Sequence, residues 1–310
     1  MGQSSRCRFI YTPDYFCDIG TRVFPMQKYG LVRDRLIEEG VPESAFSAPE
    51  PASRDDLLLV HTPRYLDDLF ACRWSTATSA SELPIAPDIV RGFRLAAGGS
   101  SLACRLAIEN GVAMNLAGGF HHAFADHAEG FCYINDVAYA VRLLRAEGAV
   151  ERAVVVDLDV HQGNGTAAIF QSEPEVFTFS MHQENNYPLK RRSDLDDGLP
   201  DGIGDEEYLQ RLQGHLRRIL DEHRPGLVLY VAGVDVYGQD LLGGLSLTLE
   251  GMRARDAAVV EACRERGIPV AGVLAGGYAQ QIEDTVRAHL NTARLFWEAG
   301  CRPLGGEAHG

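Results

Sequence analysis

Short apolar runs rich in β-branched residues recur along the chain. Each run is too short to be a typical helix and suits a strand that is buried on both faces. We therefore predict strands within residues 8–12, 112–117, 153–159, 176–182, 227–235 and 269–278.

Helical patterns lie between these runs, and several of them end at a glycine, as a helix C-terminus often does. We predict helices within residues 25–40, 87–111, 134–148, 205–223 and 248–267. Alternating strands and helices indicate an α/β fold, with a parallel sheet covered on both faces.

The chain of 310 residues is long enough for two average domains, although single α/β domains often exceed about 250 residues. No internal repeat or low-complexity tract divides it. We interpret the polar stretch 184–207 as an excursion loop rather than a domain linker. We therefore expect one domain spanning residues 1–310.

Composition narrows the classes of partner. Lys and Arg number 29 against 43 Asp and Glu, which gives a net charge of −14. This balance argues against direct nucleic-acid binding and mildly favours cationic ligands.

The seven cysteines include no CxxC pair, so we expect neither a disulfide framework nor a cysteine zinc site, and a reducing cytoplasm fits best. We predict no signal peptide and no membrane span.

Reactive residues cluster directly after the apolar runs. In open parallel sheets the ligand crevice lies beyond the carboxyl ends of the strands, so such clustering predicts an active site at that edge. The residues concerned are His121, His122, Asp157, Asp159, His161, Asn164, Asp235 and Tyr278.

The segment "DLDVH" points to a metal. Asp157, Asp159 and His161 share one parity, so on an extended chain their side chains lean to the same side. Buried together without a cation, these groups would cost several kcal/mol. Asp159, His161 and Asp235 give three ligands and leave open positions, as a catalytic site requires, with Asp157 behind them.

An isolated DxDxH pattern is more often a polar cluster after a buried strand. The coincidence of acids, Tyr278 behind two glycines and tandem histidines at separate strand ends favours the metal site. A second metal would need further carboxylates, most simply at positions 163 and 237, where this chain has Gly163 and Tyr237. We therefore expect one metal ion.

The adjacent His121 and His122 are poorly placed to chelate one ion with both rings, because neighbouring side chains point in different directions. Two separate proton-handling roles suit them better.

Several motifs together resemble the histone deacetylase superfamily, which includes bacterial acetoin-utilisation-type and acetylpolyamine deacetylases. The likeness runs from about residue 8 to 298, and the spacing of "LGGLS" is most similar to the class IV branch. The motifs are "GGFHHA", "EGFCYINDVAYAV", "VVVDLDVHQGNGT", "AGVDVYGQDLLGGLS" and "LAGGY". The resemblance implies a single arginase-type α/β domain.

The resemblance also implies roles for individual residues. Zinc, or alternatively iron(II) or cobalt(II), would be held by Asp159, His161 and Asp235. The catalytic group would comprise His121, His122, Asp157, Asn164 and Tyr278, with Tyr278 stabilising the transition state. The acyl-lysine tunnel would include Gly130, Phe131, Tyr187 and Gly276. A structural potassium ion, held largely by main-chain carbonyls, would lie around Asp157, Asp159, His161, Ser180 and Met181.

In many members of that superfamily the second histidine is paired with an aspartate, but Asn164 occupies the matching position here. A neutral amide orients the ring without stabilising the imidazolium ion. We therefore predict that His122 is neutral at pH 7.

The expected function is a metal-dependent amidohydrolase that removes acetyl or longer acyl groups from lysine side chains of proteins or peptides. The alternative is an acetylpolyamine or other small-amine deacetylase, ranked second because the sequence offers no clear acid at the tunnel entrance. A catalytically silent acyl-lysine-binding protein is disfavoured, since Tyr278 and all three ligands are present. The oligomeric state is open.

We expect the remaining polar residues to be solvated or to form structural hydrogen bonds. We expect Asp126 and His127, which share a loop with Glu129, to be solvated, and His61 and His182 to be structural hydrogen-bonding groups. We expect the basic residues 190–192 to lie on a solvated loop, balanced by Asp194, Asp196 and Asp197.

Overall fold

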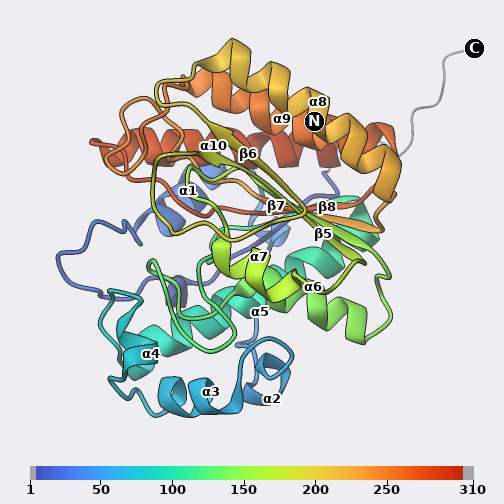
Figure 1. Cartoon of the computed structure of the whole chain (residues 1–310). Helices are drawn as coiled ribbons and strands as arrows, with labels where there is room; N and C mark the ends of the chain where they lie inside the picture. Colours follow the sequence, from blue (N-terminus) through green and yellow to red (C-terminus); the bar gives the residue numbers. More distant parts are fainter. Residues whose placement is uncertain (1–4, 303–310) are drawn as a thin grey trace, which may run out of the picture.

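The computed structural model describes residues 5–302 and shows one eight-stranded parallel sheet with helices on both faces (Figure 1). The strand order is β2-β1-β3-β8-β7-β4-β5-β6. The strands are β1 (Arg8–Ile10), β2 (Phe46–Ser47), β3 (Val112–Asn115), β4 (Ala153–Asp157), β5 (Val176–Gln183), β6 (Leu195–Leu199), β7 (Leu227–Val231) and β8 (Val270–Val273). The predicted fold class is confirmed.

Helices α1, α8, α9 and α10 cover one face of the sheet, and α5, α6 and α7 cover the other (Figure 1). The helices are α1 (Lys28–Glu38), α2 (Arg54–Leu57), α3 (Pro63–Phe70), α4 (Thr76–Ser79), α5 (Pro87–Asn110), α6 (Asp136–Ala146), α7 (Asn164–Phe170), α8 (Asp205–His223), α9 (Leu249–Glu265) and α10 (Ile282–Gly300). Short 3-10 turns occur at Pro13–Tyr15 and Glu43–Ala45.

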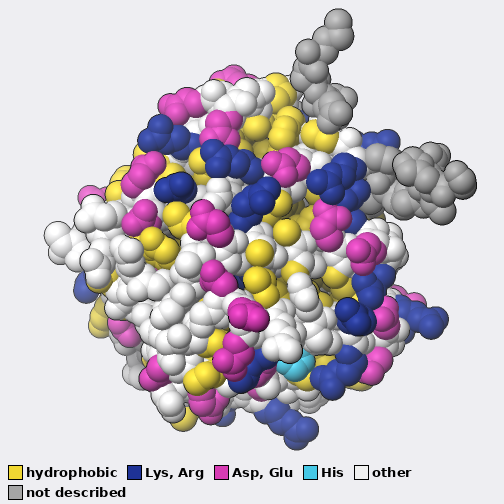
Figure 2. All heavy atoms as spheres, turned by 90° about the horizontal axis from the view of Figure 1, so that it is seen from above, with side chains coloured by type: hydrophobic (Ala, Val, Ile, Leu, Met, Phe, Trp, Pro, Cys, Tyr) yellow, Lys and Arg dark blue, Asp and Glu magenta, His cyan; other side chains and the backbone are white. Residues whose placement is uncertain are grey.

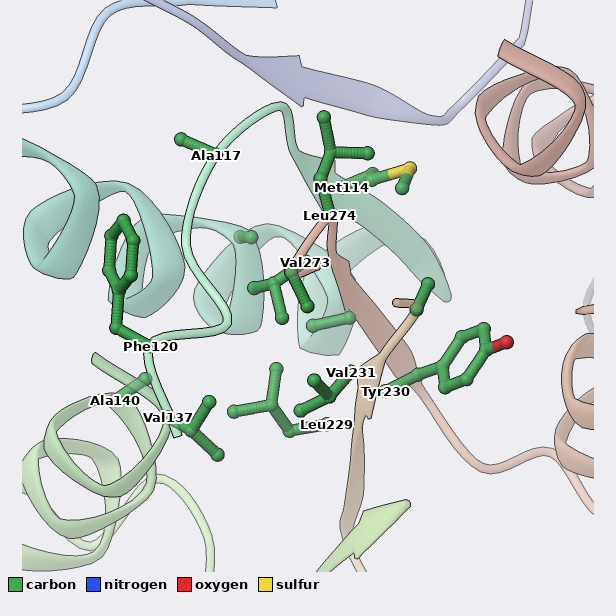
Figure 3. Packing of buried hydrophobic residues seen from close by; sticks show 14 of the residues in the cluster. Met114, Ala117, Phe120, Val137, Ala140, Leu229, Tyr230, Val231, Val273 and Leu274 are labelled. Carbon is green, nitrogen blue, oxygen red and sulfur yellow. The ribbon is translucent and has the colours of Figure 1, made fainter. Parts of the chain in front are cut away.

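The core follows from the continuous apolar strands. Every residue of β3, β4, β7 and β8 is buried, as a parallel sheet sandwiched between two helical layers requires. Figure 3 shows part of this core, in which side chains from α6, β7 and β8 belong to one cluster. These four strands are adjacent, so the loops that follow them emerge together at the middle of the sheet.

Each predicted strand and helix is present, but the loop assigned to 184–207 is wrong in part. Strand β6 lies within it, and its Leu195 and Leu199 pair with Phe179 and Gln183 of β5. The strand is polar because it forms an edge of the sheet, where only one side is paired.

Helix α10 was not predicted, although its pattern was present in the sequence. Its buried side chains include Val286, Leu290, Ala293 and Phe296, spaced three or four residues apart as on one face of a helix.

The face over α8, α9 and α10 mixes both signs of charge. Figure 2 shows Lys and Arg side chains interspersed with Asp and Glu across it. Pairs such as Arg266 with Asp221 and Arg302 with Glu261 join neighbouring elements there. Among residues 5–302, no helix is both long enough and apolar enough to cross a bilayer.

One buried guanidinium ties the loops after β4 and β7 to helix α9. Arg255 donates from Nη1 to the carbonyl oxygens of Leu158 and Gly233, at 3.2 and 2.6 Å, and from Nε to Asp256 Oδ1 at 2.9 Å. Both side chains of this ion pair are buried. The pair therefore holds two loops that lead into the site.

We expect Arg255→Met to lower the free energy of unfolding by about 3–5 kcal/mol, because it leaves a buried charge on Asp256 without its partner. Urea denaturation followed by circular dichroism measures this. Arg253→Met, the same change at an exposed position of α9, should alter stability by less than about 0.5 kcal/mol. Equal losses in the two variants would contradict the assignment.

Candidate active site

Asp159, His161 and Asp235 converge beyond the ends of two neighbouring strands. Asp159 and His161 follow β4, and Asp235 follows β7, which pairs with β4 in parallel. All three side chains are buried, and their candidate ligand atoms lie within 4.8 Å of one another. The structure thus brings together the residues that the sequence predicted as metal ligands.

The chemistry of this cluster fits a divalent cation. His161 Nδ1 lies 3.2 Å from Asp159 Oδ1 and 3.3 Å from Asp235 Oδ2. Within the described chain, Asp235 Oδ2 is a buried oxygen without a hydrogen-bond partner. Burial, followed by the charge of Asp159, raises the pKa of Asp235 to about 7. A cation would satisfy this oxygen and offset the repulsion between the two carboxylates.

Gly276 lets the backbone approach these carboxylates closely. A Cβ at this position would lie 2.1 Å from Asp235 Oδ2 and 2.5 Å from Asp159 Oδ2, well inside van der Waals contact. The Gly276 amide instead donates a hydrogen bond to Asp159 Oδ2 at 2.9 Å. Any side chain here would enter the space between the predicted ligands.

The two adjacent histidines have different partners. In the loop after β3, His121 Nδ1 lies 2.7 Å from Asp157 Oδ2, while His122 Nδ1 lies 2.8 Å from Asn164 Oδ1. Their Nε2 atoms are 3.1 Å apart. Both rings are buried beside the predicted metal ligands.

These partners separate the pKa values of the two rings. Burial disfavours the charge on His121, but the carboxylate of Asp157 outweighs it and raises the pKa to about 9. Burial, with the neighbouring His121 and His161, holds the pKa of His122 well below its usual range. From the protein groups alone, His121 is charged and His122 neutral at pH 7, in line with the expectation drawn from Asn164.

Tyr278 faces the same site from the loop after β8. Its ring is buried against Phe24 and Phe131, with ring centroids 6.0 and 6.1 Å away. Asp240, for which no role was predicted, accepts a hydrogen bond from the Tyr278 amide at 2.7 Å. Asp240 also accepts from the amides of Leu242 and Gly243, so one carboxylate holds the tyrosine loop against its neighbour.

A narrow cavity of about 20 Å³ is lined by the two adjacent histidines, Asp159, His161 and Tyr278, and it shares several lining residues with an outer pocket of about 230 Å³. Gly130, Phe131 and Tyr278 line both, and Gly276 lines the inner part. Tyr187 lines the outer part, so the structure assembles all four predicted tunnel residues. A larger hollow of about 770 Å³ lies elsewhere, around Trp297, but it holds none of these groups.

Glu82 also lines the outer pocket, where it is exposed. Glu82 could not be predicted from the sequence, because it lies outside every motif and follows no strand. Its φ is +63°, and its backbone amide donates to the Ser79 carbonyl oxygen at 3.1 Å. The outer pocket therefore has an acidic residue, contrary to the expectation that the tunnel entrance offers no clear acid.

Glu129, for which the sequence predicted no role, is partly buried, with 26% of its side chain exposed. Its carboxylate Oε1 accepts hydrogen bonds from Asn164 Nδ2 at 2.8 Å and from the Tyr187 hydroxyl at 3.1 Å. The loop turns back on itself through backbone hydrogen bonds between Glu129 and Cys132, which directs the side chain inward. His127 lies between Asp126, at 2.7 Å, and Glu129, at 3.7 Å.

Residues 190–192 lie on a largely exposed loop, as expected, and the charge of Asp196 acts on Lys190, but no ion pair joins residues 190–192 to Asp194, Asp196 or Asp197. Lys190 Nζ donates to the carbonyl oxygens of Gln183 and Asn186, and the Arg191 guanidinium lies 5.6 Å from the ring centroid of Phe124. The acids have partners of their own. Asp194 accepts from Thr178, Asp196 from Gln162 and Ser193, and Asp197 pairs with Arg211 and His215.

Two further histidines have the structural roles expected of them. His61 Nδ1 faces the Phe124 carbonyl at 3.0 Å, and its Nε2 accepts from the Asn135 amide at 3.2 Å. His182 Nδ1 lies 2.9 Å from Ser180 Oγ. Strand register places Ser180 beside Asp157, so the residues of the predicted potassium site lie on β5 and on β4 or the loop that follows it. The ion itself stays a prediction.

Comparison with known proteins agrees with this geometry. A family model described as the histone deacetylase domain matches residues 22–293. An uncharacterized protein of Picosynechococcus is 45% identical over 90% of this chain and 95% of its own length. Histone deacetylase 2 of Arabidopsis thaliana is 33% identical over 85% of this chain and 72% of its own. The crystal structure of an HDAC homologue from Aquifex aeolicus matches 96% of this chain and 84% of its own, with a TM-score of 0.79 at 26% identity.

We expect Asp235→Asn to remove the rise in Tm that zinc gives the wild-type protein, because the amide lacks the charge and basicity of the ligand. Saturation at 100 times Kd stabilises a protein by about 2.7 kcal/mol. After chelation, the variant should be at least as stable as wild type, since the repulsion with Asp159 is gone. Differential scanning calorimetry with and without zinc measures both effects.

Asp197→Asn is the matched control, because this acid lies outside the cluster and pairs with Arg211 and His215. Its zinc response should equal that of wild type. An undiminished zinc response in Asp235→Asn would show that the ion binds elsewhere.

Proposed function

Because the chain belongs to the histone deacetylase family of amidohydrolases, we propose that it hydrolyses the side-chain amide of acyl-lysine in proteins or peptides. The observation that carries the proposal is the convergence, in one narrow cavity, of a ligand cluster, two histidines with different partners and a buried tyrosine. We further propose that residues 1–310 form a single catalytic domain.

A divalent ion, with zinc preferred and iron(II) or cobalt(II) as alternatives, would be held by Asp159, His161 and Asp235. When bound, such an ion supplies Lewis acidity, which polarises the amide carbonyl and makes water a better nucleophile at neutral pH. A potassium ion beside β4 and β5 is a second, structural proposal.

His122 is the candidate general base. We assign its ring proton to Nδ1, which then donates to Asn164 Oδ1 and leaves Nε2 unprotonated at the cavity, 3.1 Å from His121 Nε2. A neutral imidazole can take a proton at its unprotonated nitrogen, whereas a charged one cannot.

His121 complements it as the charged member of the pair. Asp157 stabilises the imidazolium form, and the two Nε2 atoms are close enough for a proton to be shared. The pair can therefore accept a proton from water and return one to the departing lysine nitrogen, with the two rings held in different protonation states by their environments.

Tyr278 is the candidate donor to the oxyanion that forms when water adds to the carbonyl. Burial and the charges of Asp235 and Asp159 raise the pKa of its hydroxyl well above the usual value, so it stays protonated and able to donate. A donor of this kind acts most strongly in a site from which water is excluded.

The cavity walls suit a long aliphatic arm. Phe24 and Phe131 line the inner part, and Phe131 continues into the outer pocket beside Tyr187. Aromatic side chains of this kind offer apolar contact to the methylene groups of a lysine.

The reducing cytoplasm stays the proposed compartment, supported by seven cysteines that are all free thiols.

The second candidate function, deacetylation of polyamines or similar small amines, gains support from Glu82. An acid at the mouth of the outer pocket would attract the free ammonium group of such a substrate, and the net charge of −14 acts in the same direction. The two functions share their chemistry and differ in what must fit at the mouth.

Turnover of an acetyl-lysine peptide, a myristoyl-lysine peptide and acetylputrescine by the zinc-loaded protein tests these alternatives. We expect the highest kcat/KM on a lysine peptide, loss of turnover after chelation and recovery with zinc. Turnover of acetylputrescine alone would establish the second candidate function, and turnover of none of the three would refute both.

We expect Tyr278→Phe to lower kcat by about 10²- to 10³-fold, the usual cost of removing one oxyanion donor. Substrate affinity should change little, because the ring and its aromatic contacts remain. Steady-state kinetics on the best substrate gives both values. Tyr237→Phe removes a hydroxyl outside the cavity and should leave kcat unchanged; a normal rate in Tyr278→Phe would refute the role of the phenol.

A further inference from the structure

We propose that Glu129 is a positioning residue for His122, and that it acts through the side-chain amide of Asn164. The inference rests on the proposed function, in which His122 is the base. It goes beyond the family likeness, because it assigns a role to an acid that neither touches the predicted ligands nor faces the reacting atoms.

A continuous chain of contacts carries the proposal. Glu129 Oε1 accepts from Asn164 Nδ2 at 2.8 Å, and Asn164 Oδ1 lies 2.8 Å from His122 Nδ1. Asn164 is buried, so water does not compete for either end of its amide. The carboxylate is therefore the next group beyond the amide that contacts the base.

The carboxylate determines which way the amide faces. An asparagine amide has one accepting and one donating end, and only a partner of known type distinguishes them. Glu129 accepts only, so it takes the NH₂ end, and the Gly165 amide donates to Oδ1 at 3.0 Å. Oδ1 must then face His122, which places the ring proton on Nδ1 and the lone pair on Nε2.

Glu129 also supplies the negative charge that the neutral Asn164 lacks. Burial disfavours the charged form, but hydrogen bonds from His127, Asn164 and Tyr187 outweigh it and lower the pKa of Glu129. An ionised acceptor polarises the amide and strengthens the hydrogen bond that Asn164 makes to the ring. The charge stands one side chain farther from His122 than a directly paired carboxylate would.

The position of Glu129 is fixed from two sides. Its Oε1 also accepts from the Tyr187 hydroxyl, whose ring lies 5.2 Å from that of His122. At the next residue, a Cβ on Gly130 would lie 2.7 Å from His122 Cδ2 and 2.8 Å from the Tyr187 hydroxyl. The glycine lets the loop approach, so the carboxylate reaches Asn164.

The decisive experiment is an exchange of the two groups. Glu129→Gln removes the charge, and Asn164→Asp places two carboxylates in contact. Each should lower kcat by about 10- to 100-fold, as loss of a supporting hydrogen bond typically does, with KM nearly unchanged. In the double variant the acid contacts His122 directly and the amide stands behind it, so most of kcat should return. Losses that multiply in the double variant would overturn the proposal.

Asp126→Asn is the matched control. It removes the same charge from the same loop, but among residues 5–302 the ion pair of Asp126 is with His127, and its side chain is 70% exposed. Its kcat should equal that of wild type, and a loss as large as that of Glu129→Gln would overturn the proposal in favour of a general effect of charge. Thermal unfolding of every variant shows whether the fold is retained.

A readout independent of turnover separates this inference from the proposed function. In zinc-loaded protein with ¹⁵N-labelled histidine, the Nδ1 proton of His122, assigned with His122→Gln, should move to lower chemical shift in Glu129→Gln as its hydrogen bond weakens. It should stay in place in Asp126→Asn. An unchanged shift in Glu129→Gln overturns the proposal, whereas a changed shift in a protein without turnover supports it and refutes the proposed function alone.

Discussion

The burial of two carboxylates beside an imidazole is the constraint on which the rest of the site depends. Asp159 and Asp235 lie beyond the ends of adjacent parallel strands, and the register of β4 and β7 places their carboxylates close together although like charges repel. Such an arrangement persists only if other parts of the fold compensate for it. Backbone amides of Val160, His161 and Gly276 donate to the two carboxylates, and a divalent ion would complete the compensation.

The two adjacent histidines likewise depend on the groups that contact them. Position in the chain makes His121 and His122 neighbours, and nothing in their own chemistry distinguishes them. The difference comes from what stands behind each ring, a carboxylate in one case and an amide backed by a carboxylate in the other. In the proposed mechanism, the protonation states of the two rings are therefore set by the residues behind them.

Much of the architecture could be predicted because a parallel sheet leaves a strong record in the sequence. Buried strands are continuous apolar runs, and the reactive residues follow them in a way that revealed Asp159, His161, Asp235 and Tyr278. Strand β6 was not predicted because an edge strand need not be apolar. The positions of Glu129 and Glu82 in the site could not be predicted for another reason. They depend on how loops fold back in three dimensions, which no periodic sequence pattern indicates.

Arg255 has a consequence for how defects in this protein are interpreted. Its guanidinium reaches from α9 to the carbonyl oxygens of Leu158 and Gly233, each close in sequence to a predicted ligand. A substitution that loosens this contact would displace both ligand-bearing loops at once, although Arg255 itself belongs to the helical layer. Inactive variants in a random library would therefore include lesions in the helical layer that mimic the loss of a ligand, and only a fold measurement would distinguish the two.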